Sequence, residues 1–199
     1  MDIGRPVFTR ASFTGDRYSI LANSSRGHSV PVINGVEQGI GRSYTARVAH
    51  YRTGEVSSIV YDLTRAYPEE AGLVAFTRRC ELDRSGGACV RVRDRIELRD
   101  AGDVVHCYYC CVEPIVDRHT FELPARRGAL VASIESHPAG GGARGGEEDG
   151  ARPADVRVVE LRDAGNGAPA YRVEYAQSGH RFDVELVIRV RAESGTRTL

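Results

Sequence analysis

Lysine, tryptophan and long apolar runs are all missing from this 199-residue sequence. No stretch approaches the roughly 18 apolar residues of a membrane-spanning helix, so we expect no membrane span. No basic and then apolar leader follows Met1, so we expect no signal peptide in this chain. All 27 basic residues are arginine, and 27 acidic residues balance them to a net charge of zero. A neutral chain has no overall field that would favour nucleic acid or an anionic membrane as a partner.

Helical periodicity is also lacking, over any window of about eleven residues or more. Instead, short runs of β-branched and aromatic residues alternate with Gly, Asp, Asn and Pro. This pattern predicts an all-β fold, namely an antiparallel β-sandwich of many short strands. The expected strands cover residues 17–22, 29–33, 43–51, 56–63, 74–82, 88–98, 104–112, 119–123, 129–135, 156–161, 170–175 and 182–190.

The same pattern divides the chain into three parts. Residues 1–136 carry most of the expected strands and form the core of the sandwich. Apart from Pro138, residues 137–150 contain no apolar side chain larger than alanine, so burial cannot offset their ordering entropy. We therefore predict a flexible Gly/Ala-rich loop over 137–155. Residues 156–199 should add the last strands of the same sandwich and a frayed tail.

The five cysteines are an odd number, so at least one is unpaired within the chain. If residues 84–85 form a two-residue turn, Cys80 and Cys89 face each other across a hairpin. A disulfide between them is then geometrically allowed, but a register slip of one residue would remove it, so the pairing stays open.

The other three cysteines lie in or beside one expected strand. Cys107 and Cys110 point to opposite faces of that strand, which argues against a redox or zinc-binding pair. We expect both of these thiols, and that of Cys111, to be buried and unreactive.

His28 is the histidine that most invites a functional interpretation. It lies between Gly27 and the expected strand 29–33, and Asp2 lies upstream in an Asp-x-Gly segment. A histidine at a strand end together with a distant aspartate can form part of a metal site. A lone histidine is, however, more often a hydrogen-bonded loop residue, and position alone favours that interpretation.

Three polar residues follow the strand that begins after His28. Asn34-Gly35 has the sequence of a type I′ turn, so turn chemistry accounts for Asn34. Glu37 and Gln38 could line the edge of a cleft.

Other titratable residues carry weaker signals. Asp62 and Asp94 could be taken for a carboxylate pair, but arginines beside each of them favour solvated or ion-paired faces. Four further histidines form no metal-ligand spacing; they are His106, His119, His137 and His180.

These segments resemble, in their order and spacing, the C-terminal β-sandwich of the heparinase II/III-like polysaccharide lyases. The likeness runs through Asp2-x-Gly4, Gly27-His28-Ser29, residues 61–67, Arg78 or Arg79, and Val92-Arg93-Asp94-Arg95, and it covers roughly residues 2–135. It implies a β-sandwich beneath a substrate cleft, in a chain that lacks the family's N-terminal (α/α) toroid.

The resemblance also implies a metal. In that family a metal ion lies in the sandwich, and the motifs of two of its ligands fall on Asp2 and His28. A further histidine comes from a His-x-His motif that has no counterpart here. Because zinc prefers four ligands, we expect zinc in a full-length parent and weak or absent binding in this chain. Phe8 lies near the place of a cleft-facing tyrosine, and it could stack on a sugar without hydrogen-bonding it. The resemblance also implies that Gln38 could contact a sugar hydroxyl.

The family's reaction is β-elimination at a uronic acid of a polysaccharide such as a glycosaminoglycan. Its main acid/base is a tyrosine of the helical toroid, so none of the nine tyrosines here is assigned that role, and we expect the isolated chain to be inactive. The implied partners are an acidic polysaccharide and the missing toroid, and the implied location is the periplasm or exterior of a bacterium. The alternatives are a stand-alone, non-catalytic binding module for acidic polysaccharide, which usually shows exposed aromatic rows, and a structural domain without a ligand.

Overall fold

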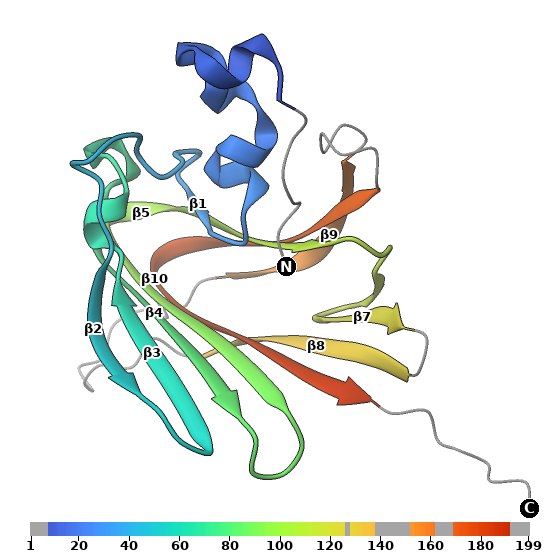
Figure 1. The fold of residues 1–199 in the computed structure, drawn as a ribbon. Helices are drawn as coiled ribbons and strands as arrows, with labels where there is room; N and C mark the ends of the chain where they lie inside the picture. Colours follow the sequence, from blue (N-terminus) through green and yellow to red (C-terminus); the bar gives the residue numbers. More distant parts are fainter. Residues whose placement is uncertain (1–7, 126–127, 138–151, 162–168, 192–199) are drawn as a thin grey trace, which may run out of the picture.

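Ten strands among the residues that the structure describes form one antiparallel sheet. The computed structural model describes residues 8–125, 128–137, 152–161 and 169–191. Six short 3-10 helices accompany the sheet, and no α-helix occurs among the described residues (Figure 1). In the same ranges, no helix is long and apolar enough to cross a membrane. The predicted all-β antiparallel fold is therefore confirmed.

The strands are β1 (Val32–Ile33), β2 (Arg47–Arg52), β3 (Val56–Asp62), β4 (Leu73–Asp83), β5 (Cys89–Cys110), β6 (Ile115–Asp117), β7 (Thr120–Ala125), β8 (Gly128–Ser136), β9 (Arg152–Leu161) and β10 (Ala170–Arg191). The 3-10 helices are η1 (Arg10–Phe13), η2 (Gly15–Ser19), η3 (Leu21–Asn23), η4 (Ser25–Gly27), η5 (Thr64–Ala66) and η6 (Glu69–Ala71). Along the sheet the order is β2-β3-β4-β5-β10-β8-β7-β6, with β1 paired to β5 and β9 paired to β10.

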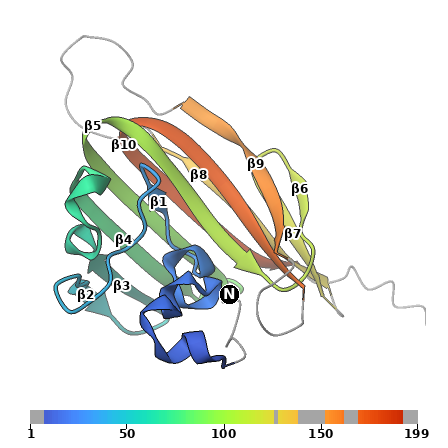
Figure 2. The same cartoon turned by 90° about the horizontal axis from the view of Figure 1, so that it is seen from above.

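Two long strands, β5 and β10, fold this sheet into two layers. The first half of β10 pairs with the second half of β5 and with β9, whereas its second half pairs with the first half of β5 and with β8. At the junction Gly179 pairs with Gly102 and Arg181 with Glu97, so residues 98–101 of β5 bulge out of the ladder. A bulge bends its strand. Both strands turn here and pass from one layer of the sandwich to the other (Figures 1 and 2).

An apolar core fills the space between the two layers. Its buried members come from β5, β7, β8 and both halves of β10: Tyr108, Cys110, Phe121, Leu123, Ala132, Ile134, Val173, Tyr175, Val184 and Leu186. A second core packs β1, η5 and η6 against the sheet: Ile33, Leu63, Ala66, Tyr67, Ala71, Phe76, Ile96, Leu98, Val104 and Phe182. The second core joins the N-terminal segment to the sandwich.

The prediction of many short strands is wrong for β5 and β10, which have 22 residues each. The expected strands 88–98 and 104–112 are one strand, and so are 170–175 and 182–190. The Gly and Asp residues between each pair mark bends and not chain reversals, because the two long strands remain paired with each other on both sides of the bulge.

Residues 17–22 lie in η2 and η3 instead of the expected strand. The hydroxyl of Ser19 donates to the carbonyl of Asp16 over 2.7 Å, and the amide of Asn23 donates to the carbonyl of Arg17 over 2.9 Å. Such local bonds from side chain to backbone compete with strand pairing, which explains the difference.

The turn at Asn34-Gly35 forms as predicted. Both residues have positive φ angles, 51° and 74°. Ile33 and Val36 bond to each other across the turn, over 3.1 and 2.8 Å, as in a two-residue hairpin. The Asn34 amide also bonds the Ala71 carbonyl and the Asp103 N–H, so it links η6 to β5.

No disulfide joins the five cysteines, all of which lie in described residues. The register of β4 and β5 pairs Cys80 with Val92 and Asp83 with Cys89, so the bond between Cys80 and Cys89 does not form. The Asp83 carboxylate accepts the N–H of Ser85 over 2.9 Å, which favours a longer turn than the two-residue one.

Cys107 and Cys110 are buried as expected, and burial raises the pKa of each thiol to about 11. Both thiols therefore stay protonated and unreactive near neutral pH. The expectation for Cys111 is wrong, because this residue follows the end of β5 and is exposed.

Most of the predicted loop 137–155 and the predicted frayed tail lie outside the described residues. Strand β9 begins at Arg152, so residues 152–155 belong to a strand and not to the loop. The last two strands, β9 and β10, pair within the same sheet as the first eight.

Candidate functional site

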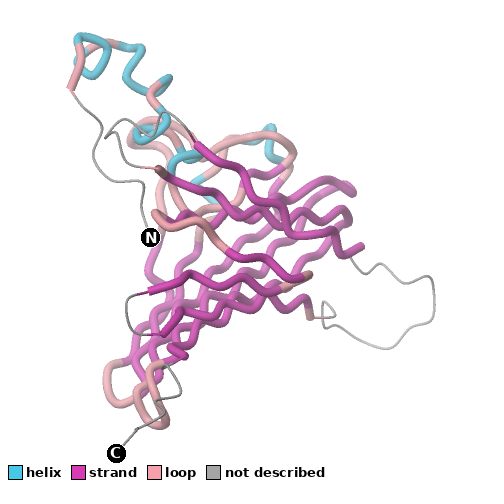
Figure 3. The backbone as a smooth tube through the Cα atoms, turned by 90° about the vertical axis from the view of Figure 1, so that its right-hand side faces the viewer, coloured by secondary structure: helices cyan, strands magenta, loops and turns pink. Residues whose placement is uncertain are grey.

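A pocket of about 350 Å³ lies where the N-terminal 3-10 helices meet the loop after β1. These helices gather at one end of the sheet (Figure 3). His28 and Gln38, which the sequence singled out, both line the pocket, together with Glu37 and Tyr18. The fold therefore brings three of the predicted site or cleft residues into one cavity.

Hydrogen bonds between η4 and the loop after β1 build one wall of the pocket. The backbone N–H of Gln38 donates to the hydroxyl of Ser25 over 2.9 Å. The carboxylate of Glu37 accepts the backbone N–H of Arg26 over 3.2 Å and pairs with its guanidinium at 2.8 Å. His28 ends η4, so these contacts position it relative to Gln38.

Gly27 is required immediately before His28. A Cβ at this position would lie 2.2 Å from the carbonyl oxygen of Leu21, closer than any real side-chain carbon. The N–H of Gly27 donates to Ser24, and that of His28 donates to Ser25. The close approach of η3 and η4 depends on the missing side chain.

Three hydrogen bonds, from residues of β4, of β5 and of the segment between η5 and η6, hold the segment after His28. The guanidinium of Arg78 donates to the carbonyl of Ser29 over 2.7 Å, and the N–H of Tyr109 donates to the Ser29 hydroxyl over 3.2 Å. The hydroxyl of Tyr67 donates to the carbonyl of Pro31 over 2.6 Å. Burial raises the pKa of Tyr67 far above its usual range, so the phenol keeps its proton and acts as a structural donor.

Arg78 is itself held by a buried carboxylate. It bonds Asp94 through two nitrogens, both at 2.6 Å, and Nδ1 of His106 lies 3.2 Å from the same carboxylate. Burial alone would raise the pKa of Asp94, but the charge and hydrogen bonds of Arg78, aided by His106, hold that pKa well below its usual range. Asp94 therefore stays ionised and fixes Arg78 against the carbonyl of Ser29.

Asp62 and Asp94 do not form a carboxylate pair. Asp62 lies opposite Thr77 and Asp94 lies opposite Arg78, so the two aspartates point to opposite faces of the sheet. Asp62 pairs with Arg47 at 3.3 Å. Both aspartates are ion-paired as expected, although Asp94 is buried and not solvated.

The predicted metal ligands are only partly described. Asp2 lies outside the described residues, so its pairing with His28 stays a prediction. Within the described ranges, no group of three metal-ligating side chains includes His28. The described residues thus do not complete a zinc site around His28, and we derive no chemical step through a metal there. Phe8 is 55% exposed and stacks on Phe13, with ring centroids 5.9 Å apart.

Sequence reasoning missed a second group of polar side chains, at the end of β8. One ligand atom from each of Glu135, His137 and Glu185 lies within 4.8 Å of the others. The spacing of Glu135 and His137 puts both on one face of a strand, which the period of two could have indicated. Glu185 joins them only through the register of β8 and β10, which the sequence did not reveal.

Comparisons with known proteins give a likeness in structure alone. No protein-family model and no curated protein match this chain. A crystal structure of heparinase III is 10% identical, with a TM-score of 0.61 over 94% of this chain and 27% of that one. Heparan sulfate lyase HepC from Pedobacter heparinus is 14% identical, with a TM-score of 0.63 over 97% and 29%. A further heparinase III, the BT4657 gene product, is 11% identical, with a TM-score of 0.62 over 97% and 28%.

These matches cover nearly all of this chain but less than a third of each lyase. At 10–14% identity they establish a common fold and leave the chemistry open. The fold expected from the resemblance is confirmed: this chain has the fold of a part of heparinase III and of heparan sulfate lyase HepC.

Proposed function

We propose that this chain is the β-sandwich part of a heparinase II/III-like lyase that cleaves uronic-acid-containing polysaccharides by β-elimination. The observation that carries the proposal is the likeness in fold to part of three lyase structures, over 94–97% of the chain. The shared pocket of His28 and Gln38 supports it, because the resemblance and the sequence had singled out these residues.

The chemistry assigns this chain a supporting role. In β-elimination a base removes the proton next to the uronate carboxylate, the glycosidic oxygen leaves and an unsaturated sugar remains. The imidazole of His28 and the amide of Gln38 can hydrogen-bond sugar hydroxyls at the pocket. Tyr67 keeps its proton and is already committed to Pro31, so it is not assigned as the base. We place the acid/base residues in a helical toroid of a longer protein.

We also propose that Asp2 and His28 bind zinc in that longer protein. Zinc there would help to shape the floor of the cleft beneath the substrate. Two protein ligands bind zinc poorly, so the proposal requires further ligands from the rest of the parent.

The size of the native protein in its producing cell tests the lyase proposal. We expect an antibody against this chain to detect a band well above 21.7 kDa, the mass of the chain. The larger protein should release unsaturated uronate from heparan sulfate, seen as ultraviolet absorbance, whereas this chain should release none. A single band at the mass of the chain, or release of product by the chain itself, would contradict the proposal.

Binding by the chain tests the site. A heparan sulfate oligosaccharide titrated into the chain should bind less tightly after His28→Ala or Gln38→Ala. His50→Ala is the matched control, because His50 is exposed on β2 and does not line the pocket. Equal binding by all three variants would remove the pocket from the proposal.

A stand-alone binding module for acidic polysaccharide is the second candidate. A groove of about 330 Å³ on the sheet is lined by three arginines and two glutamates, namely Arg79, Arg93, Arg95, Glu81 and Glu185. Guanidinium groups suit carboxylates and sulfates, although Arg93 and Arg95 already pair with Asp183. Retention on a heparin column at moderate salt, by a native protein of the chain's own mass, would favour this candidate over the lyase.

A further inference from the structure

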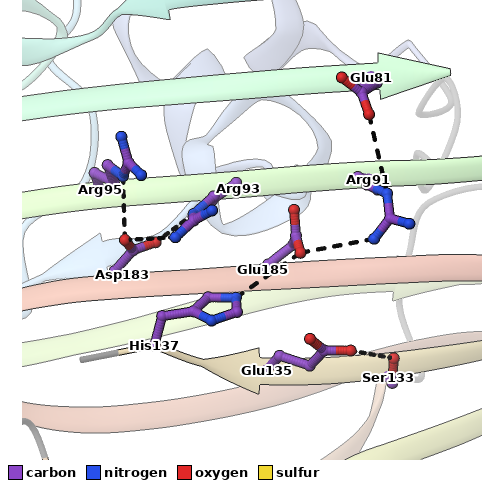
Figure 4. Close-up of polar contacts among 9 residues, drawn as sticks. All are labelled: Glu81, Arg91, Arg93, Arg95, Ser133, Glu135, His137, Asp183 and Glu185. Carbon is purple, nitrogen blue, oxygen red and sulfur yellow. Dashed lines mark hydrogen bonds and ion pairs between the residues drawn. The ribbon is translucent and has the colours of Figure 1, made fainter. Parts of the chain in front are cut away.

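The face of the sheet that includes Arg93 and Arg95 carries charged side chains from four neighbouring strands, β4, β5, β10 and β8 (Figure 4). Most of its carboxylates are satisfied by arginines. Asp183 accepts bonds from Arg93 at 2.6 Å and from Arg95 at 3.1 Å. Glu81 accepts a bond from Arg79 at 2.5 Å. These carboxylates are therefore already engaged by arginines.

Glu135, His137 and Glu185 are arranged differently. Glu185 lies directly opposite Glu135 in the ladder of β8 and β10. His137 is two residues beyond Glu135. Its backbone N–H donates to the carbonyl of Asp183 over 2.8 Å, so the ladder of β8 and β10 extends to His137 and holds its backbone in place. The three side chains therefore share one face, and their ligand atoms lie within 4.8 Å of one another.

The inner nitrogen of His137 points to what this group could hold. Its Nε2 atom is shielded from solvent and has no hydrogen-bond partner among the described residues. It lies 3.8 Å from a carboxylate oxygen of Glu185, too far for a hydrogen bond. Ligand atoms about 2.1 Å from a tetrahedral zinc ion lie about 3.4 Å from one another, so small side-chain rotations would close the group around a metal.

The local charge is compatible with a cation. Two arginines lie near the group. Arg93 lies opposite Glu185 in the ladder of β5 and β10 but donates to Asp183. The guanidinium of Arg91 lies 3.8 Å from Glu185 and 3.9 Å from Glu81. Both distances are too long for hydrogen bonds, so Arg91 can pair with Glu81 alone when a metal takes Glu185. Glu135 is exposed, its contact with the hydroxyl of Ser133 is a long one of 3.5 Å, and it can turn toward the metal.

We propose that Glu135, His137 and Glu185 bind a divalent transition-metal ion of the zinc class. One imidazole nitrogen and two carboxylate oxygens suit zinc better than calcium or magnesium, which take oxygen ligands almost exclusively. Three protein ligands leave the fourth position of the metal to water or to an added ligand. The site lies on β8 and β10, and it rests on neither the lyase assignment nor His28.

Zinc titration of the purified chain tests the site. Isothermal titration calorimetry would use a Cys111→Ser background, since an exposed thiol can bind zinc itself. We expect the Cys111→Ser protein to bind one zinc ion. His137→Ala and Glu185→Gln should each weaken zinc binding by more than about tenfold. Losing a residue that only orients a metal ligand already weakens metal binding about tenfold or more, and these two residues are the proposed ligands themselves. His50→Ala, which removes an exposed histidine of β2, should bind as the Cys111→Ser protein does.

Melting curves without metal show whether each variant still folds, and His137→Gln replaces His137→Ala if the alanine variant does not. Zinc should raise the melting temperature of the Cys111→Ser protein and of its His50→Ala variant, but not that of its His137 variants. The proposal would be overturned if the Cys111→Ser protein bound no zinc. It would also be overturned if the His137→Ala or His137→Gln variant bound zinc as tightly as that protein does. If His28→Ala abolished zinc binding and His137→Ala did not, the zinc would bind in the N-terminal pocket. That result would overturn the site at His137 and support the proposed zinc ligand His28.

Discussion

Asp94 and Arg78 are the residue pair on which the position of His28 depends. Asp94 is 2% exposed, and Arg78 connects it to the carbonyl of Ser29. Replacing such a pair by apolar residues can be neutral, but removing one partner leaves an uncompensated buried charge. Removing either Arg78 or Asp94 should therefore destabilise the contact that holds the segment after η4.

Asp94→Asn should lower the free energy of unfolding by about 3–5 kcal/mol near neutral pH, because it leaves the charge of Arg78 buried without a counter-charge. Urea denaturation measures this change. Glu122→Gln is the control, since Glu122 pairs with Arg191 at the surface and its loss should change little. Equal midpoints for the two variants would show that the buried pair does not support the fold.

The same pair makes stability depend on pH. The pKa of Asp94 is lower in the folded than in the unfolded chain, so its contribution is complete above the unfolded pKa, about 3.9, and declines as the pH falls from there toward the folded pKa. The difference in stability between the wild type and Asp94→Asn should therefore be constant from neutral pH down to about pH 5 and shrink below about pH 4. A difference that grows on acidification would contradict the assignment.

Among the structural elements, the hairpin of β4 and β5 shows how register decides which side chains meet. A two-residue turn would have placed Cys89 opposite Cys80. In the structure Val92, three residues further along β5, lies opposite Cys80. The Asp83 turn shifts the whole ladder, and each directly opposed pair shares a face of the sheet.

Val92→Cys should therefore form a disulfide with Cys80 under mild oxidation, because directly opposed residues have their Cβ atoms about 4.5–5.5 Å apart. Arg91→Cys is the control, since Arg91 lies opposite Glu81 and points to the other face. Peptide mapping by mass spectrometry identifies the bond. A Cys80–Cys89 bond in the wild type, or a bond from the residue-91 variant to Cys80, would show that the register is wrong.

At the scale of the whole molecule, β5 and β10 tie both layers to one core. Leu186 is 4% exposed in that core, on the half of β10 that pairs with β8. Side chains of the other layer, such as Val173 and Tyr175, belong to the same core. The two layers should therefore unfold together.

Leu186→Ala should lower the free energy of unfolding by about 2–5 kcal/mol and keep a single transition. Far-ultraviolet circular dichroism and tyrosine fluorescence should report the same midpoint, because strands and core are lost at once. Val190→Ala on the same strand should change little, since Val190 is 62% exposed. Two separate midpoints would mean that the layers are independent units.

Much of the secondary structure followed from local chemistry. Alternating β-branched and aromatic residues predicted the strands, and Asn34-Gly35 predicted a two-residue turn that the positive φ angles confirm. The candidate site was also visible in part, because His28 and Gln38 are close in sequence and line one pocket.

Other features depend on residues far apart in the chain. Whether the Gly and Asp residues after Leu98 reverse the chain or only bend it depends on the pairing of β5 with β10, not on their own preferences. The burial of Asp94 depends on Arg78 across the ladder, and the group at His137 depends on Glu185 from β10.

The β-rich character of the chain, the turn at Asn34 and the neutral charge are local or additive properties, so the order of the amino acids was sufficient to establish them. The two-layer path of β5 and β10, the buried Arg78–Asp94 pair and the group around His137 arise from register and long-range packing. Since each ladder position couples residues from distant segments, a shift of one residue would send these side chains to the opposite face. Their meeting is therefore a property of the assembled sheet.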